Sequence, residues 1–159
     1  MLSYRHIYHA GNFADVFKHV VLVQLLRALQ RKDAPLFVLD THAGIGRYDL
    51  AADEAQKNRE FAAGVQRTLE CVEPPEAVAE YLDLVRAENA DDETLRHYPG
   101  SPRLIRALLR PQDRLALTEL HPADFAALKT LFAGDRQVAV HRQDAYQGLK
   151  AFLPPRERR

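Results

Sequence analysis

The chain has 159 residues, with 22 Lys and Arg side chains against 22 Asp and Glu, so its formal net charge is zero. This length and a hydrophobic fraction of 47% are typical of one compact globular domain, and zero net charge excludes a uniformly basic nucleic-acid binder. No apolar run approaches the roughly 18 residues of a membrane-spanning helix, and the first residues lack a signal-peptide pattern, so we expect a cytoplasmic protein. The single cysteine, Cys71, excludes an intrachain disulfide, and we expect it to be a small core residue.

The charges are divided unevenly along the chain. Residues 1–32 hold five basic side chains against one acidic side chain. Residues 50–99 hold twelve acidic against five basic side chains, and residues 100–159 hold eleven basic against six acidic ones. This division favours a partner that faces the outer segments while the acidic segment stands away from it. Solvated helix faces are an alternative explanation that charge alone does not exclude.

The first predicted element is a helix from Asn12, a good N-cap residue, to about Lys32. Apolar residues recur through this segment with helical spacing, so we expect most of the helix surface to be buried. Asp15, Lys18 and His19 fall on one narrow polar stripe. The three side chains are therefore expected to project together from an otherwise buried helix.

Three short apolar runs predict the strands of a sheet, at residues 36–39, 115–120 and 137–141. Helical patterns at residues 102–110 and 122–133 separate the later strands. Because strand and helix alternate, we predict an α/β fold with a parallel sheet.

The segment of residues 51–97 does not fit a single crossover connection between two strands. It carries two helical patterns, at about residues 54–71 and 75–89, which a Pro-Pro pair separates. We interpret the segment as an inserted helical subdomain. The expected organisation is an N-terminal part with the first helix and strand over residues 1–50, the insertion over 51–97, and the continuation of the α/β domain over 98–159.

Acidic residues follow each of the predicted strands, at Asp40, Glu119 and Asp144, and Gly44 and Gly46 follow the first one. Ligands of open α/β sheets bind at the carboxyl ends of the strands. In nucleotide-binding units, glycines let the backbone approach the ligand, and an acidic residue accepts hydrogen bonds from ribose hydroxyls. The third glycine of the dinucleotide fingerprint is missing. This absence disfavours a pyrophosphate ligand and favours a nucleoside such as S-adenosylmethionine.

Structural roles compete with this interpretation of the acidic residues. Glu119 alone is also suited to capping a helix, and Asp144 to capping the helix that begins near Ala145. His42 either points into the ligand crevice at the carboxyl ends of the strands or forms a hydrogen bond with nearby loop backbone. The seven histidines show no zinc-binding spacing, so no metal site is expected.

Residues 1–12 interleave aromatic rings with basic or titratable side chains. Tyrosine and histidine rings stack on unpaired bases, and Arg5 would meet a phosphate, which is the chemistry of contacts with single-stranded RNA. The alternative is that Tyr4 and Tyr8 pack against the domain.

Several motifs together resemble a known family, the bacterial 23S ribosomal RNA adenine-N6 methyltransferases (RlmJ family), also known as proteins involved in catabolism of external DNA. The resemblance extends over essentially the whole chain. The motifs that carry it are Leu2-Ser3-Tyr4-Arg5-His6, His9-Ala10-Gly11-Asn12, Ala14-Asp15-Val16, Lys18-His19, Leu39-Asp40-Thr41-His42-Ala43-Gly44, Gly46-Arg47-Tyr48, Tyr98-Pro99-Gly100-Ser101-Pro102 and Leu117-Thr118-Glu119-Leu120-His121-Pro122.

The resemblance implies a class I S-adenosylmethionine-dependent methyltransferase, with a Rossmann-like parallel sheet and an inserted helical subdomain, that makes N6-methyladenine in 23S ribosomal RNA. Two alternatives stay open: methylation of adenine N6 in DNA, and non-enzymatic nucleic-acid binding in the use of external DNA. Carried over position by position, the resemblance implies cofactor contacts from His19, His42, Ser101, Glu119, Asp144 and Ala145, and substrate RNA contacts from Tyr4, His6 and Lys18.

One departure from the family concerns the catalytic residues. The family's fourth strand ends in Asp-Pro-Pro-Tyr, whereas Leu153 and Arg156 flank the Pro-Pro pair of this chain. We therefore expect a chain truncated before the fourth strand, with no catalytic residue of its own and with the catalytic acid lying beyond Arg159. Such a chain would bind the cofactor without transferring methyl groups. The complete protein is expected to be monomeric, and the 159-residue chain is expected to self-associate through the exposed edge of its first strand.

Overall fold

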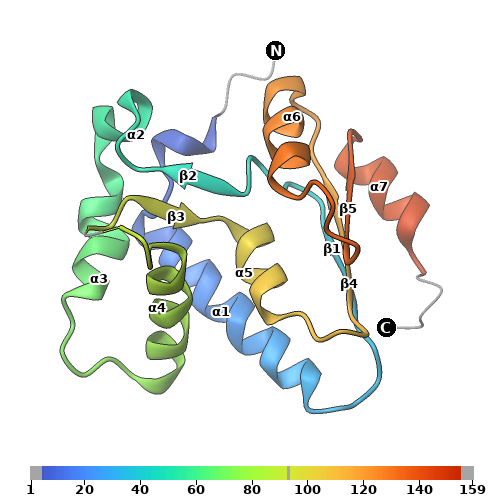
Figure 1. The fold of residues 1–159 in the computed structure, drawn as a ribbon, viewed down its shortest axis with the longest axis horizontal. Coiled ribbons are helices and arrows are strands. Elements are labelled where there is room, and N and C mark those ends of the chain that lie inside the picture. The colour runs from blue at the N-terminus through green and yellow to red at the C-terminus, as the bar shows by residue number, and fades with distance from the viewer. Residues whose placement is uncertain (1–4, 93, 155–159) are drawn as a thin grey trace. The chain divides into compact units, whose positions relative to one another are not determined.

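The computed structural model describes residues 5–92 and 94–154, which form two compact units (Figure 1). Each unit is built from two separate stretches of the chain. The first unit holds the described residues up to Leu25 together with Arg47–Gly100. The second unit holds Leu26–Gly46 together with the described residues from Ser101 onward, and helix α1 (Phe13–Gln30) contributes residues to both. Within the described residues, no helix combines the length and apolar character that a membrane span requires.

The second unit contains a three-stranded parallel sheet in the order β1-β4-β5. Its strands are β1 (Phe37–Asp40), β4 (Arg114–Thr118) and β5 (Val138–His141). The central strand β4 is buried from its second residue to its last, because it has a neighbour on each side. Among the described strands β1 lies at an edge of the sheet, and its residues are only partly buried. The predicted α/β class and parallel sheet are confirmed.

Three helices accompany this sheet, and local sequence signals mark the starts of two of them. The helix α5 spans Ser101–Leu108, α6 spans Pro122–Leu131, and α7 spans Ala145–Phe152. Helix α6 begins at a proline, which is favourable at the first helical position because its missing N–H is not needed there. The helical patterns at residues 102–110 and 122–133 predicted two of these helices close to their observed bounds.

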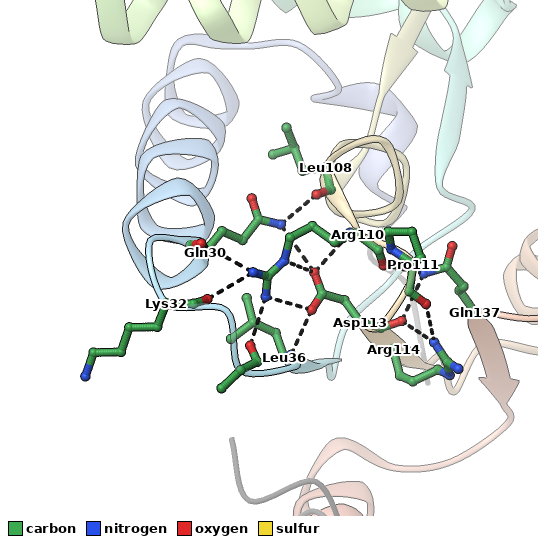
Figure 2. A network of polar contacts seen from close by, with 10 residues as sticks. Gln30, Lys32, Leu36, Leu108, Arg110, Pro111, Asp113, Arg114 and Gln137 are labelled. Carbon is green, nitrogen blue, oxygen red and sulfur yellow. Dashed lines mark hydrogen bonds and ion pairs between the residues drawn. The ribbon is translucent and has the colours of Figure 1, made fainter.

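A polar network ties the connection after α1 to the beginning of the sheet (Figure 2). The buried carboxylate of Asp113 accepts hydrogen bonds from the backbone N–H of Leu36 at 2.8 Å and from Nε and Nη2 of Arg110 at 3.0 Å each. Arg110 donates in turn to the carbonyl oxygens of Lys32 and Ala34 at 2.9 Å each. Desolvation by burial would raise the pKa of Asp113, but its hydrogen bonds with Arg110 and the backbone outweigh this effect and hold it at about 2. The network therefore holds the chain between α1 and β1 by charge-assisted hydrogen bonds.

The first unit combines a two-stranded antiparallel ribbon with short helices. Its buried side chains include Val65, Tyr81, Leu82, Val85 and Tyr98. The ribbon was not predicted, since strands of three residues are too short to show an alternating pattern. In chain order the elements of this unit besides α1 are the 3₁₀ helix η1 (His6–Tyr8), β2 (Arg47–Asp49), α2 (Asp53–Asn58), the π-helix η2 (Ala62–Gln66), α3 (Arg67–Leu69), α4 (Glu76–Glu88) and β3 (His97–Pro99).

The helix predicted over residues 54–71 is broken, so the prediction of one continuous element was wrong. Helix α2 ends at Asn58, its C-cap Arg59 adopts a left-handed φ of 50°, and the π-helix η2 follows. A second irregularity lies within η2 at Gly64, where the backbone is non-helical and an added Cβ would lie 2.1 Å from the carbonyl oxygen of Gly11. Cys71, which was expected in the core, is exposed just after the end of α3.

The first turns of α1 bury polar side chains and expose apolar ones, contrary to the prediction. Asp15 and His19 are 1% and 7% exposed, whereas Phe13 and Phe17 are 77% and 72% exposed. Only Lys18 of the expected polar stripe is exposed. The prediction that these three polar side chains project together from a buried helix was wrong, because the first unit supplies buried polar partners for two of them.

Candidate functional site

The carboxyl ends of the three parallel strands meet at one edge of the sheet in the second unit. Asp40 is the last residue of β1, Glu119 directly follows β4, and Asp144 lies between β5 and α7. The backbone N–H of Glu119 donates to the carbonyl oxygen of His141 at 3.1 Å, which continues the β4–β5 pairing beyond the strands. The structure therefore brings the three acidic side chains to the same edge of the sheet.

Glu119 connects the turn after β1 with the segment that leads into α6. Its Oε2 accepts a hydrogen bond from the backbone N–H of Gly44 at 2.9 Å, and its Oε1 accepts one from the backbone N–H of His121 at 2.8 Å. The N-cap of α6 is His121, so Glu119 does not cap that helix. A carboxylate oxygen accepts more than one hydrogen bond, so Glu119 retains acceptor capacity for hydroxyl groups of a ligand.

Asp40 is a hydrogen-bond acceptor for two residues that the family resemblance places at the cofactor. Its Oδ2 accepts a hydrogen bond from the Ser101 hydroxyl at 2.6 Å, and its Oδ1 accepts one from the backbone N–H of His42 at 3.1 Å. Desolvation by burial raises the pKa of Asp40, although the hydrogen bonds from Ser101 and His42 oppose the shift. Sequence reasoning missed this connecting role, and its only signal was an acidic residue at the end of a strand.

Asp144 and His42 both make local hydrogen bonds. The Oδ1 of Asp144 accepts hydrogen bonds from the backbone N–H groups of Tyr146 and Gln147, at 2.9 and 3.2 Å, so Asp144 is the N-cap of α7. Within the described residues its Oδ2 makes no hydrogen bond, and this oxygen can serve a ligand. The exposed His42 ring lies with Nδ1 3.0 Å from the Thr41 hydroxyl, so its local partner is a side chain instead of loop backbone.

Gly46 has a packing role that the glycine motif did not predict. Its φ is 78°, and a Cβ at this position would lie 2.8 Å from Cδ2 of Leu131 and 3.0 Å from Cδ1 of Leu128. The turn therefore needs a glycine for its left-handed backbone and for close packing against α6. The structure gives no support to the expectation that this glycine lets the backbone approach a ligand.

A second polar cluster surrounds the buried Asp15 in the first unit. Its Oδ2 accepts a hydrogen bond from the backbone N–H of Gly11 at 3.0 Å and lies 2.8 Å from Nε2 of His6. Its Oδ1 forms an ion pair with Nζ of Lys18 at 2.8 Å. Desolvation would raise the pKa of Asp15, but the interactions with His6 and Lys18 outweigh it and hold the pKa well below its usual range.

Two of the residues that the resemblance assigns to RNA thus share one carboxylate partner. His6 and Lys18 both contact Asp15, and Tyr4 lies outside the described residues. Sequence reasoning did not identify Asp15 as their common partner. The signal for Lys18 was its spacing of three residues from Asp15, whereas the contact with His6 depends on how the chain folds before α1.

His19 lies in a buried chain of hydrogen bonds in the same unit. Its Nδ1 is 2.7 Å from the hydroxyl of Tyr98, and the two rings stack with centroids 5.7 Å apart. The Tyr98 hydroxyl is in turn 3.1 Å from the hydroxyl of Tyr81. Desolvation lowers the pKa of His19 to about 4, so the ring is neutral at neutral pH.

The candidate cofactor residues therefore belong mainly to the second unit, which holds His42, Ser101, Glu119, Asp144 and the buried Ala145, while His19 belongs to the first. The edge of the sheet offers carboxylate acceptors at three strand ends. Such a set of acceptors suits a ligand that carries hydroxyl or amino donors and positive charge.

Comparison with known proteins relates this chain to a family of methyltransferases. The family model described as "Ribosomal RNA large subunit methyltransferase D, RlmJ" matches residues 33–159. Two curated proteins named "Ribosomal RNA large subunit methyltransferase J" align with all 159 residues, one from Haemophilus influenzae at 45% identity and one from Escherichia coli K12 at 46%. The aligned region is 57% of the first relative and 56% of the second, so the chain spans just over half of their length.

A solved structure resembles the chain as well. The crystal structure of a protein from Legionella pneumophila superimposes with a TM-score of 0.84 at 42% sequence identity. The match covers 94% of this chain and 54% of that one. Most of this chain is therefore similar in fold to part of a longer protein.

Proposed function

The chain belongs to the ribosomal RNA large subunit methyltransferase family described as RlmJ, and on this premise we propose that the complete protein methylates adenine N6 in 23S ribosomal RNA with S-adenosylmethionine as donor. The observation that carries the proposal is the set of acidic side chains at the carboxyl ends of three neighbouring parallel strands. Because the chain spans just over half the length of its relatives, the activity is assigned to the complete protein. A ribosomal RNA substrate implies that it acts in the cytoplasm.

The residues at the sheet edge fit S-adenosylmethionine in charge and in hydrogen-bonding capacity. In the proposed arrangement, the typical one for a class I methyltransferase, Glu119 accepts hydrogen bonds from the ribose hydroxyls, and Oδ2 of Asp144 accepts one from the adenine amino group. Asp40 holds Ser101 and the backbone of His42 beside them. When bound, S-adenosylmethionine supplies an electrophilic methyl group, and its positive charges match the acidic edge. The family resemblance adds the adjacent Ala145 backbone and His19 as further contacts.

The proposed RNA contacts are Tyr4, His6 and Lys18. The Lys18 side chain is 61% exposed although its Nζ pairs with Asp15, so its ammonium can also meet a phosphate. Because the pairing with Asp15 already restricts the Lys18 side chain, RNA binding would cost less side-chain entropy, which favours a preformed contact.

The methyl acceptor needs more than a bound donor. The exocyclic nitrogen of adenine is a poor nucleophile because its lone pair is delocalised into the ring, so orientation and hydrogen bonding supply the catalysis. The 159 residues contain no Asp-Pro-Pro-Tyr motif. We therefore assign to them the binding of the donor, and to another part of the complete protein the groups that hold the adenine amino group.

Calorimetric titration of the chain with S-adenosylmethionine tests the cofactor site. Glu119→Gln removes one acceptor oxygen and its charge, and Asp144→Asn keeps the N-cap oxygen while it removes the charge. Loss of a hydrogen bond to a charged group is worth about 1.5–3 kcal/mol, so each substitution is expected to weaken binding roughly 10- to 100-fold. Glu73→Gln, at an exposed position between α3 and α4, serves as the control and should leave the affinity unchanged. Unchanged affinity in both site variants would overturn the proposed site.

A further inference from the structure

Three polar side chains in the first unit, His19, Tyr98 and Tyr81, form a buried hydrogen-bonded chain. We propose that Tyr98 is a positioning residue that holds the His19 ring in the tautomer protonated on Nε2. His19 then presents an N–H donor, and the ligand group that it binds is a hydrogen-bond acceptor such as a carboxylate.

The geometry leaves the ring of His19 little freedom. Tyr81 and Tyr98 are fully buried, and His19 is 7% exposed. The distances are 2.7 Å from Nδ1 of His19 to the Tyr98 hydroxyl and 3.1 Å from that hydroxyl to the Tyr81 hydroxyl. The stacking of the His19 and Tyr98 rings, with 23° between their planes, keeps Nδ1 directed at the hydroxyl. Within the described part of the chain, neither hydroxyl has another hydrogen-bond partner.

Counting protons along this chain distinguishes the two neutral tautomers. If Nδ1 carried the proton, it would donate to the Tyr98 oxygen. The single contact between the Tyr98 and Tyr81 hydroxyls uses only one of their two protons, so the other would be buried without an acceptor. If Nε2 carries the proton, Tyr81 donates to Tyr98 and Tyr98 donates to Nδ1, so both hydroxyl protons have an acceptor and the Nε2–H group is left for a ligand or water. An orphaned buried donor is costly enough to favour the second arrangement by roughly tenfold to a hundredfold.

The neighbouring charges do not provide a competing acceptor. Desolvation keeps His19 neutral, and the groups that act on it electrostatically are Asp15, Lys18 and His6. Asp15 is the anion among them: its Oδ2 contacts the backbone of Gly11 and His6, its Oδ1 forms the ion pair with Lys18, and among the described residues no hydrogen bond joins Asp15 to His19. The hydrogen-bonded chain to the tyrosines therefore decides where the imidazole proton lies.

The tautomer determines what His19 can recognise. An Nε2–H group donates to an acceptor, whereas an unprotonated Nε2 would accept a hydrogen bond from an ammonium or amino group. This step rests on the proposed function: if His19 contacts S-adenosylmethionine, its partner is the α-carboxylate and not the ammonium or the adenine amino group.

Nitrogen NMR of the chain labelled with ¹⁵N-histidine at pH 7 tests the tautomer without any ligand. For His19 we expect Nδ1 to have the shift of an unprotonated imidazole nitrogen and Nε2 that of a protonated one. Tyr98→Phe should give a mixture of the two tautomers. Tyr81→Phe should leave the tautomer unchanged because the Tyr98 hydroxyl still donates to Nδ1, and Tyr48→Phe, another buried tyrosine of the unit, is the control. A wild-type Nδ1 that carries the proton, or an unaltered tautomer in Tyr98→Phe, would overturn the inference.

A second measurement separates this inference from the proposed function. If about half of the His19 rings change tautomer in Tyr98→Phe, affinity for S-adenosylmethionine should fall about twofold or more, and affinity for its decarboxylated analogue should not change. Equal weakening for both ligands would refute the carboxylate as the partner. Failure of the wild-type chain to bind S-adenosylmethionine would contradict the proposed function, while the NMR result would still decide the tautomer.

Discussion

Removal of the Asp113 charge should destabilise the chain strongly. Asp113→Asn keeps the size of the side chain but leaves the Arg110 guanidinium without its anionic partner in the network of Figure 2. The amide also presents N–H donors where the carboxylate accepted hydrogen bonds from Leu36 and Arg110. The connection between α1 and β1 would therefore lose its main polar attachment.

Two independent routes give the size of the effect. The pKa of Asp113 is lowered from 3.8 to about 2, and each unit corresponds to about 1.4 kcal/mol, so the folded state gains about 2–3 kcal/mol from the ionised form. Breaking a buried ion pair costs about 3–5 kcal/mol. Because the Arg110 side chain is 22% exposed, the lower end applies, and we expect a loss of about 3 kcal/mol in the free energy of unfolding.

Urea unfolding followed by circular dichroism measures this loss, with the exposed Asp91→Asn as the control. A carboxyl group whose pKa is lower in the folded than in the unfolded state stabilises the fold at pH values above its unfolded pKa. The Asp113 contribution is therefore present above about pH 4 and is lost as the pH falls toward about 2. The wild type should lose stability over this interval more steeply than Asp113→Asn. A loss below about 1 kcal/mol at pH 7, or equal pH dependence in both proteins, would refute the reasoning.

Two further predictions concern packing and association. Alanine at Gly46 must adopt a positive φ and collides with Leu131, whereas alanine at Gly134 must adopt only the positive φ. In thermal and urea unfolding, Gly46→Ala should therefore be less stable than Gly134→Ala by about 1–3 kcal/mol. Equal losses of stability in the two variants would show that α6 moves to accommodate the added methyl group. The exposed Phe17 lies on an apolar stripe of α1, so Phe17→Glu should reduce concentration-dependent self-association in sedimentation velocity while the exposed Gln66→Glu does not. A monodisperse wild-type monomer would contradict this expectation.

Local signals in the sequence predicted the elements whose ends are determined by nearby residues. Asn12 predicted the start of α1, and its Oδ1 accepts a hydrogen bond from the backbone N–H of Asp15 at 2.9 Å. Asp144 likewise predicted the start of α7. The kink at Gly64 within η2 was not predictable in this way, because Gly64 packs against the backbone of Gly11, which is distant in sequence.

The same distinction applies to the candidate site. The positions of Asp40, Glu119 and Asp144 follow from strand order, since parallel strands end at one edge of a sheet. The partners of these side chains depend on the register between distant segments, which the sequence does not show. The burial of the first turns of α1 was predicted wrongly because periodicity assigns apolar residues such as Phe17 to the interior. In the structure Phe17 is exposed and Asp15 is buried, where its carboxylate is paired with the exposed Lys18.

The most direct test of the proposed function is methyl transfer by the complete protein. Unmodified 23S ribosomal RNA and duplex DNA are each incubated with the protein and labelled S-adenosylmethionine, and the nucleosides are then identified by mass spectrometry. We predict labelled N6-methyladenosine from the RNA, strongly reduced by Glu119→Gln, and no label in the DNA. Label found only in the DNA, or binding of nucleic acid without any methyl transfer, would contradict the assignment.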